Sequence, residues 1–373
     1  MRKGEKVERT ERNYGIDLLR ILATCMIVFL HLNYKQILES VKPLSGNWFV
    51  AHGVEQICII GVNLFALISG FVNYGKKYKI TNILSLWLQI FFYSFFITLV
   101  FYFWKKPDVS VGELVSYAFP VTTYKYWYVS AYFFLFFLIP ALNLIVDKCS
   151  QRLTAIFIGI ALINCTVIGY VQNAFAVNNG FSVVWLAVLY MVGAFIKKYD
   201  WNIRIKGKPV RARFYLILYI ISVIIGLVST VLSTWLFASG GRYKYIFPLN
   251  VISAILLFLF FAKCKMKGSK PLVFLSSYSF SVYLIGSHTL FTRYFITGRF
   301  LRFLTWNPFA LLGVMIAFVV ALYALCVIIE WLRQLLLRLF RVNKGVKLLQ
   351  KQCDKLYVTY LQEPSYPPQN DEK

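Results

Sequence analysis

The sequence is short of the features that mark soluble metalloenzymes and disulfide-stabilised secreted proteins. Only 15 of its 373 residues are acidic, and only 3 are histidines. Its 7 cysteines are an odd number, and they form no CxxC pair and no His/Cys ligand spacing. We therefore expect neither a disulfide framework nor a bound metal. The sequence also has no GxSxG nucleophile elbow.

Hydrophobic residues, in contrast, occur along nearly the whole chain. They make up 59% of it, aromatic residues make up 18%, and the mean hydropathy is +0.64. This composition predicts an all-α fold, a polytopic membrane protein built as a bundle of about ten transmembrane helices. The expected spans are 15–34, 54–74, 80–104, 127–146, 153–171, 181–197, 213–237, 245–262, 272–292 and 306–331.

The distribution of charge predicts the orientation of these spans. With the N-terminus inside, the inner segments carry 29 of the 40 Lys and Arg residues and the outer segments carry 10, as the positive-inside rule requires. Both termini are then cytoplasmic. The net charge of +25 indicates topology and contact with anionic head groups on the cytoplasmic side of the bilayer, not a nucleic-acid partner.

The chain divides into three expected parts. A cytoplasmic N-terminal segment covers 1–14, a ten-span membrane domain covers 15–340, and a cytoplasmic tail covers 341–373. Apolar residues recur at helical spacing in the first part of the tail, which predicts an amphipathic helix followed by a Pro-rich disordered end.

The first span carries the most informative polar residues. Arg20 and His31 are eleven residues apart in RNYGIDLLRILATCMIVFLH, so on a helix they share one face and lie roughly 16 Å apart along the axis. Asp17, Thr24 and Ile27 lie near the same stripe. Ionisable residues at membrane depth are functional candidates by default, so this stripe suggests a site that reaches across the bilayer.

Each of these residues has a structural and a functional interpretation. Arg20 could extend to the inner head groups or pair with Asp17, or its guanidinium could bind an anion or phosphate. His31 could be an interfacial structural histidine, or a general base that takes a proton from an attacking hydroxyl. In the second span, the Ser69–Gly70 pair favours close helix packing over a nucleophilic role for Ser69.

The other two histidines also map to the outer half of the bundle. His52 is expected in the first outer loop, and His288 near the outer end of the ninth span. On the inner side, the basic connection 197–213 could contact lipid head groups or bind a polyanionic cofactor such as a nucleotide.

These elements together resemble the membrane-bound acyltransferase-3 family over about residues 12–335. The strongest mark is that family's Arg-x10-His pattern, present here as Arg20 to His31. Three weaker elements follow in the family's order: FxxxSGF at Phe65–Phe71, WY(x)nP from Trp127 and Tyr128 to Pro140, and SxSxxxYL from Ser277 through Tyr283 to Leu284.

The sequence departs from the family's pattern in two places. Many members carry a histidine directly after the YL-I of the ninth span, where this chain has Gly286, and the histidine comes two positions later as His288. The resemblance therefore assigns no role to His288. The chain also ends in a short tail without an extracytoplasmic esterase-like domain, so it resembles the stand-alone branch that includes polysaccharide O-acetyltransferases.

The resemblance implies an O-acetyltransferase of the bacterial cytoplasmic membrane. It would transfer an acetyl group from acetyl-CoA to a hydroxyl of an extracytoplasmic glycan, with Arg20 near the donor phosphates and His31 as general base. Two other interpretations stay open from the residues: a transporter or flippase of a small molecule or polysaccharide, and a scaffold for polysaccharide assembly. Discontinuous helices near the midplane would favour transport, and a requirement for the amphipathic tail would favour the scaffold.

Overall fold

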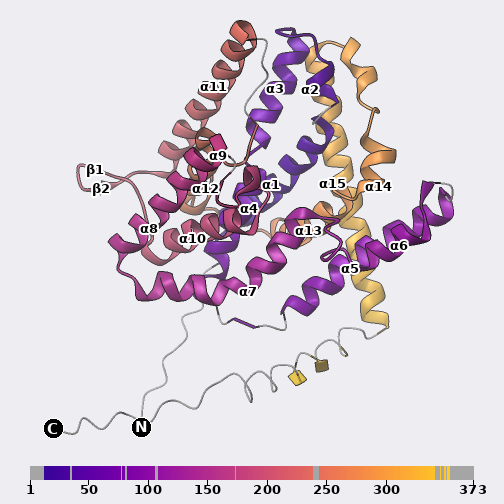
Figure 1. Cartoon of the computed structure of the whole chain (residues 1–373), viewed down its shortest axis with the longest axis horizontal. Helices are drawn as coiled ribbons and strands as arrows, with labels where there is room; N and C mark the ends of the chain where they lie inside the picture. The colour runs from indigo at the N-terminus through magenta and orange to yellow at the C-terminus, as the bar shows by residue number, and fades with distance from the viewer. Residues whose placement is uncertain are drawn as a thin grey trace.

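The computed structural model is a helical bundle, and seven of its helical segments are long and apolar enough to cross a membrane (Figure 1). It describes residues 12–33, 36–76, 78–79, 82–105, 108–172, 174–237 and 243–340, with 345, 348–349 and 351–352. The expectation of a polytopic all-α membrane protein is confirmed. The seven segments are α1 (Tyr14–Asn33), α3 (Gly46–Cys58) continued by α4 (Gly61–Asn73), α5 (Asn82–Trp104), α7 (Trp127–Lys148), α8 (Gln151–Ile163) continued to the end of α9 (Gly169–Gln172), α11 (Ala212–Phe237) and α15 (Pro308–Leu339).

Three shorter helices occupy the other three expected spans. They are α10 (Val183–Tyr199), α12 (Pro248–Lys263) and α13 (Lys270–Gly286). The remaining elements are connectors: α2 (Ile37–Ser40), α6 (Val111–Ala118), α14 (Thr289–Phe291), the π-helical turns Asn164–Ile168 and Thr292–Ile296, the 3₁₀ turns Asn178–Gly180 and Leu301–Thr305, and an antiparallel hairpin of β1 (Arg204–Ile205) and β2 (Lys208–Pro209).

Side-chain caps determine where several of these helices begin. The Ser182 hydroxyl accepts a hydrogen bond from the Trp185 backbone N–H at 3.2 Å, and Ser269 does the same for Leu272 at 3.3 Å. Asn307 caps α15 in the same way, and Pro308 follows it as the first helical residue. These residues satisfy backbone donors that a helix start leaves without intrahelical partners.

Helix α1 lies inside the bundle, where it contacts α3, α4, α12, α13 and α15 (Figure 1). Its neighbour α4 packs closely against α10 through two glycines. A Cβ on Gly70 would lie 1.9 Å from the Tyr190 carbonyl oxygen, and one on Gly193 would lie 2.1 Å from the Leu67 carbonyl oxygen. Gly70 therefore makes the close helix contact expected of the Ser69–Gly70 pair.

Three expected boundaries are wrong. The ninth span ends at Gly286 instead of residue 292, because Ser287 is the C-cap of α13. The second span begins at Gly46 instead of residue 54, because Ser45 caps the helix there, so His52 lies in a helix and not in a loop. The last span continues to Leu339 instead of ending at 331, because Arg333 pairs within the helix with Glu330 at 2.7 Å. Most of the expected tail helix, the disordered end and residues 1–11 lie outside the described residues.

Candidate functional site

A hydrogen-bonded cluster around Asp17 holds the first turns of α1. The Arg12 guanidinium donates to both carboxylate oxygens of Asp17, at 2.6 and 3.1 Å. Arg20 Nη1 lies 3.5 Å from Asp17 Oδ1 and donates to Ser276 Oγ of α13 at 3.2 Å. Ser276 in turn donates to Asp17 Oδ1 at 3.1 Å. The expected Asp17–Arg20 pair is present, and Asp17 orients Arg20 together with α13.

Next to this cluster is a hollow at the end of the bundle predicted to face the cytoplasm, which we call the inner cavity. Four cationic side chains line it, with Asp17 as the one acidic group among its described lining residues. Partial burial, and then the neighbouring charges of Arg20, Arg12 and Lys197, lower the pKa of Lys76. Four cations around one carboxylate form a site suited to an anionic ligand. The four are Arg12, Arg20, Lys76 and Lys197.

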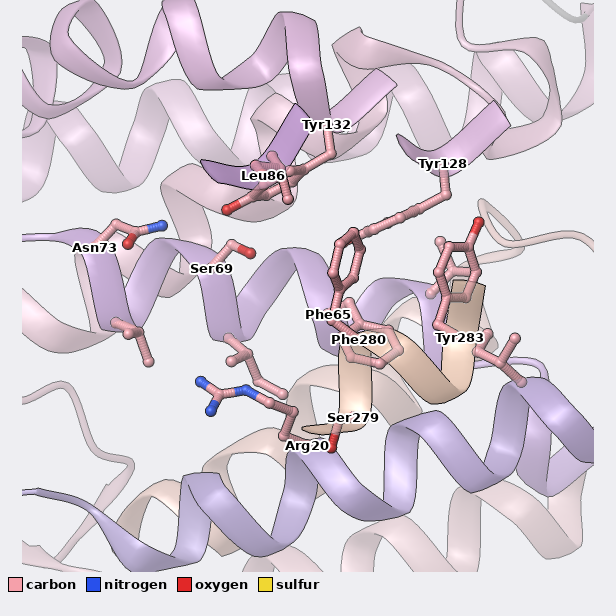
Figure 2. Close-up of a pocket in the computed structure, with 14 residues that line it drawn as sticks. Arg20, Phe65, Ser69, Asn73, Leu86, Tyr128, Tyr132, Ser279, Phe280 and Tyr283 are labelled. Carbon is pink, nitrogen blue, oxygen red and sulfur yellow. The ribbon is translucent and has the colours of Figure 1, made fainter. Parts of the chain in front are cut away.

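Arg20 also opens onto a second hollow, the central cavity, between α1, α4, α7 and α13. Figure 2 shows its guanidinium pointing into this space, on the side where Ser69 and Asn73 of α4 lie. The Arg20 side chain is 27% exposed, against 6% for Asp17. Arg20 is the single charged group among the described residues that line the central cavity, which is otherwise mainly apolar and aromatic.

The aromatic residues Tyr128 of α7 and Tyr283 of α13 form the far end of the central cavity (Figure 2). Their ring centroids are 5.8 Å apart at a steep angle of 68°, an edge-to-face packing that is favourable for aromatic pairs. Together with Ile27 and Val62 they also line the next hollow. We call these four shared residues the neck.

Beyond the neck is the outer cavity, of about 500 Å³, within the range of roughly 300–1,000 Å³ typical of small-molecule sites. His31 and Glu55 both line it. Glu55, on α3, is 1% exposed and accepts a hydrogen bond from Asn33 at 2.9 Å. Among the described residues His31 Nδ1 has no hydrogen-bond partner, so no protein contact there fixes the tautomer of the imidazole.

The wall of the outer cavity is aromatic, with a few polar groups. Trp127 packs against Phe181 and Tyr245, with centroid distances of 4.6 and 5.8 Å. Gly180 permits this approach: its φ is +99°, and a Cβ there would lie 2.6 Å from Tyr245 Cβ. Glycine adopts this positive φ readily, whereas other residues do not. The turn at Gly180 therefore places Phe181 beside Trp127.

The three cavities follow one another along a single face of α1. Arg20 belongs to both the inner and the central cavity, and Ile27 to both the central and the outer one, where His31 also lies. The stripe predicted on the first span therefore lines a row of hollows from one end of the bundle to the other. Thr24 lies between them, buried, with its hydroxyl bonded to the Arg20 carbonyl oxygen at 2.9 Å.

A family model described as an acyltransferase domain, from the acyltransferase-3 family, matches residues 13–331. The chain belongs to the acyltransferase-3 family. It is a multi-pass membrane acyltransferase, and the matched region contains all three cavities except Arg12. No curated protein and no solved structure matches the chain.

In this acyltransferase, the site residues expected from the sequence separate into groups. Arg20, Ser69, Tyr128 and Tyr283 line the central cavity, while His31 and Trp127 line the outer one with the same two tyrosines. His288 lines none of the three. It is buried, caps α14 by accepting from the Leu290 N–H at 3.2 Å, and stacks on Tyr117 at 4.7 Å.

The sequence interpretation missed several residues of the acyltransferase site. Glu55 could have been identified from the sequence, because it is an acidic residue inside an expected apolar span. Lys197 begins the basic connection 197–213, for which binding of a polyanionic cofactor is one interpretation. Lys76, Phe181 and Tyr245 had no such signal, since they reach the site from separate connections and helix ends. No group of residues in the described part of the chain could hold a metal ion.

Proposed function

We propose that this acyltransferase transfers an acetyl group from cytoplasmic acetyl-CoA to a hydroxyl of an extracytoplasmic glycan. The row of three cavities that joins Arg20 to His31 is the observation that carries this proposal. A donor too polar to cross lipid can remain at the inner mouth while its acyl end reaches the outer side.

The inner cavity supports a donor with several negative charges. Coenzyme A carries phosphates, and Arg12, Arg20, Lys76 and Lys197 supply a cationic surface with Asp17 as its one acidic group among the described lining residues. Guanidinium groups bind phosphate oxygens by charge-assisted hydrogen bonds. The mainly apolar central cavity suits the slender pantetheine arm.

The outer cavity supports a sugar acceptor. Trp127 and Tyr245, whose rings lie 25° from parallel, provide aromatic faces of the kind on which the apolar face of a sugar ring packs, and Phe181 borders them at a steeper angle. Asn179, which also lines this cavity, adds a polar group beside it. Apolar and aromatic walls with a few polar groups are typical of small-molecule sites.

His31 supplies the base for the transfer. An imidazole nitrogen takes the proton of the acceptor hydroxyl as its oxygen attacks the thioester carbonyl carbon. The carbon–sulfur bond then breaks, and the imidazolium returns the proton to the departing thiolate. Glu55 is buried and lines the same cavity, where its carboxylate would stabilise a positive charge on His31.

The test is transfer of radioactive acetyl from acetyl-CoA into glycan in membrane vesicles, measured per folded molecule. We expect His31→Ala to lower transfer roughly 10²- to 10⁴-fold, the usual contribution of a general base. His288→Gln is the matched control, because this second buried histidine lines none of the three cavities, and it should transfer normally. Equal transfer by wild type and His31→Ala would remove the assigned base. No transfer by folded wild type to any glycan would contradict the proposal.

A further inference from the structure

A fourth hollow, separate from the site, lies at the outer end of α5 and beside the segment that leads into α15. We call it the lateral pocket. It shares no lining residue with the inner, central or outer cavity and has a volume of about 450 Å³. The side chains that matter here are Trp104, Lys105, Tyr294, Phe295, Arg299 and Arg302.

The lateral pocket combines cations with aromatic rings. Lys105 Nζ lies 4.9 Å from the centroid of the Trp104 ring, and Arg302 Cζ lies 4.7 Å from that of Phe303. Arg299 Nε donates to the Tyr294 carbonyl oxygen at 3.3 Å. These contacts hold the three cations around the hollow without neutralising them.

The lateral pocket keeps a net positive charge. Within the described parts of the chain, Lys105, Arg299 and Arg302 form no salt bridge. The carboxylate of Asp108 accepts a hydrogen bond from the Tyr294 hydroxyl, and Glu113 also interacts electrostatically with Tyr294, so two acidic groups stand near the three cations. These three are among only 10 Lys and Arg residues predicted on the outer side, where basic residues are normally sparse.

The surroundings of the lateral pocket indicate where its ligand comes from. Trp104 is 56% exposed and Phe295 is 44% exposed. Along the two helices that reach the pocket, Phe103 of α5 and Phe309 and Val320 of α15 are 75%, 86% and 63% exposed. Exposed rings at the end of a transmembrane helix lie at the head-group level, and the apolar flanks of α5 and α15 offer a surface for acyl chains.

We propose that the lateral pocket binds the phosphate head group of an anionic phospholipid from the outer leaflet. The three cations contact the phosphate, the aromatic rings lie at the head-group level, and the acyl chains lie along α5 and α15. A soluble acidic glycan would need none of this apolar flank. The lateral pocket is separate from the three cavities, because it shares no lining residue with them.

Site-specific photo-crosslinking tests the assignment. The photoreactive residue p-benzoylphenylalanine replaces Phe295 in the full chain, within vesicles of equal phosphatidylglycerol and phosphatidylcholine with the same acyl chains. The matched control carries it at Phe309, which is exposed on α15 but does not line the pocket. Mass spectrometry then identifies the lipids attached at each position.

We expect about tenfold enrichment of phosphatidylglycerol over phosphatidylcholine at position 295, since each basic residue near an anionic head group contributes severalfold. At position 309, the crosslinked lipids should have the same ratio of phosphatidylglycerol to phosphatidylcholine as the vesicles. Combined Lys105→Gln, Arg299→Gln and Arg302→Gln substitutions should return position 295 to that ratio. In the unsubstituted protein, raising the salt concentration should lower the enrichment, which tests the charge dependence without relying on the folding of a variant.

Three results would overturn the proposal. The first is the same lipid ratio at 295 and 309, and the second is an enrichment that neither salt nor the triple substitution changes. The third is loss of the enrichment when soluble inorganic phosphate or an acidic oligosaccharide is added at a concentration matched to the lipid, which would identify a soluble anion as the ligand.

Discussion

Arg20 and His31 lie on one face of α1, and the cavities that they line meet at Ile27, between them in the sequence. One helix therefore carries both the residue proposed to hold the donor and the residue proposed to activate the acceptor. Their spacing is set by the rise of the helix, so loop movements do not alter it.

The first prediction concerns Arg20. Replacing it with alanine should raise the KM for acetyl-CoA roughly 10- to 100-fold, because a hydrogen bond to a charged group contributes about 1.5–3 kcal/mol. Arg152→Ala is the control, since this exposed arginine of α8 lines none of the three cavities. Steady-state kinetics with varied donor give the comparison. An unchanged KM in Arg20→Ala would exclude a phosphate contact.

The second prediction concerns the protonation of Lys76. Burial and the nearby charges of Arg20, Arg12 and Lys197 lower its pKa, whereas a bound polyanion would favour the protonated form. Donor affinity should therefore weaken as the pH rises through this lowered pKa, and it should do so earlier than for an ordinary lysine. Lys76→Arg should keep its affinity over the same alkaline series, because a guanidinium stays charged. Identical pH profiles for the two proteins would exclude Lys76 from the donor site.

The third prediction concerns Glu55. Glu55→Gln keeps an acceptor for Asn33 but removes the carboxylate from the cavity that His31 also lines. We expect thermal stability to change little and kcat to fall at least about tenfold, because charge stabilisation in a low-dielectric cavity contributes to the transition state. The comparison needs kcat and a thermal unfolding curve from the same preparation. A normal kcat would make Glu55 a purely structural residue.

The fourth prediction concerns the contact between α4 and α10. Gly70→Ala and Gly193→Ala each place a Cβ about 2 Å from a backbone carbonyl oxygen, so the helices must separate. We expect each to lower the free energy of unfolding by about 1–3 kcal/mol, as overpacking generally does. Gly159→Ala, with no heavy atom within 4 Å of its Cβ, should be neutral or slightly stabilising. Thermal unfolding in detergent compares the stability of the three variants. Equal unfolding curves for all three would mean that α4 and α10 pack less closely than the structure shows.

The fold and one part of the site could be predicted from the sequence, because they depend on local patterns. Apolar runs predict spans, and the spacing of Arg20 and His31 predicts a shared helix face. The convergence of Glu55, Lys197 and Tyr245 on that face depends on how separate helices pack, which a single sequence does not encode in any local pattern. His52 shows the same limit: its ring stacks on Trp48 at 4.1 Å within a helix that hydropathy alone places too late in the chain.

The apolar composition of the neck bears on the leakage of ions across the membrane. If continuous water filled a row of hollows through a membrane protein, protons would leak across the membrane and dissipate the proton gradient. At the neck, the rings of Tyr128 and Tyr283 and the side chains of Ile27 and Val62 present largely apolar groups between the central and the outer cavity, and a constriction of this composition would exclude hydrated ions by dewetting. The donor path that we propose would then cross the bilayer without conducting ions.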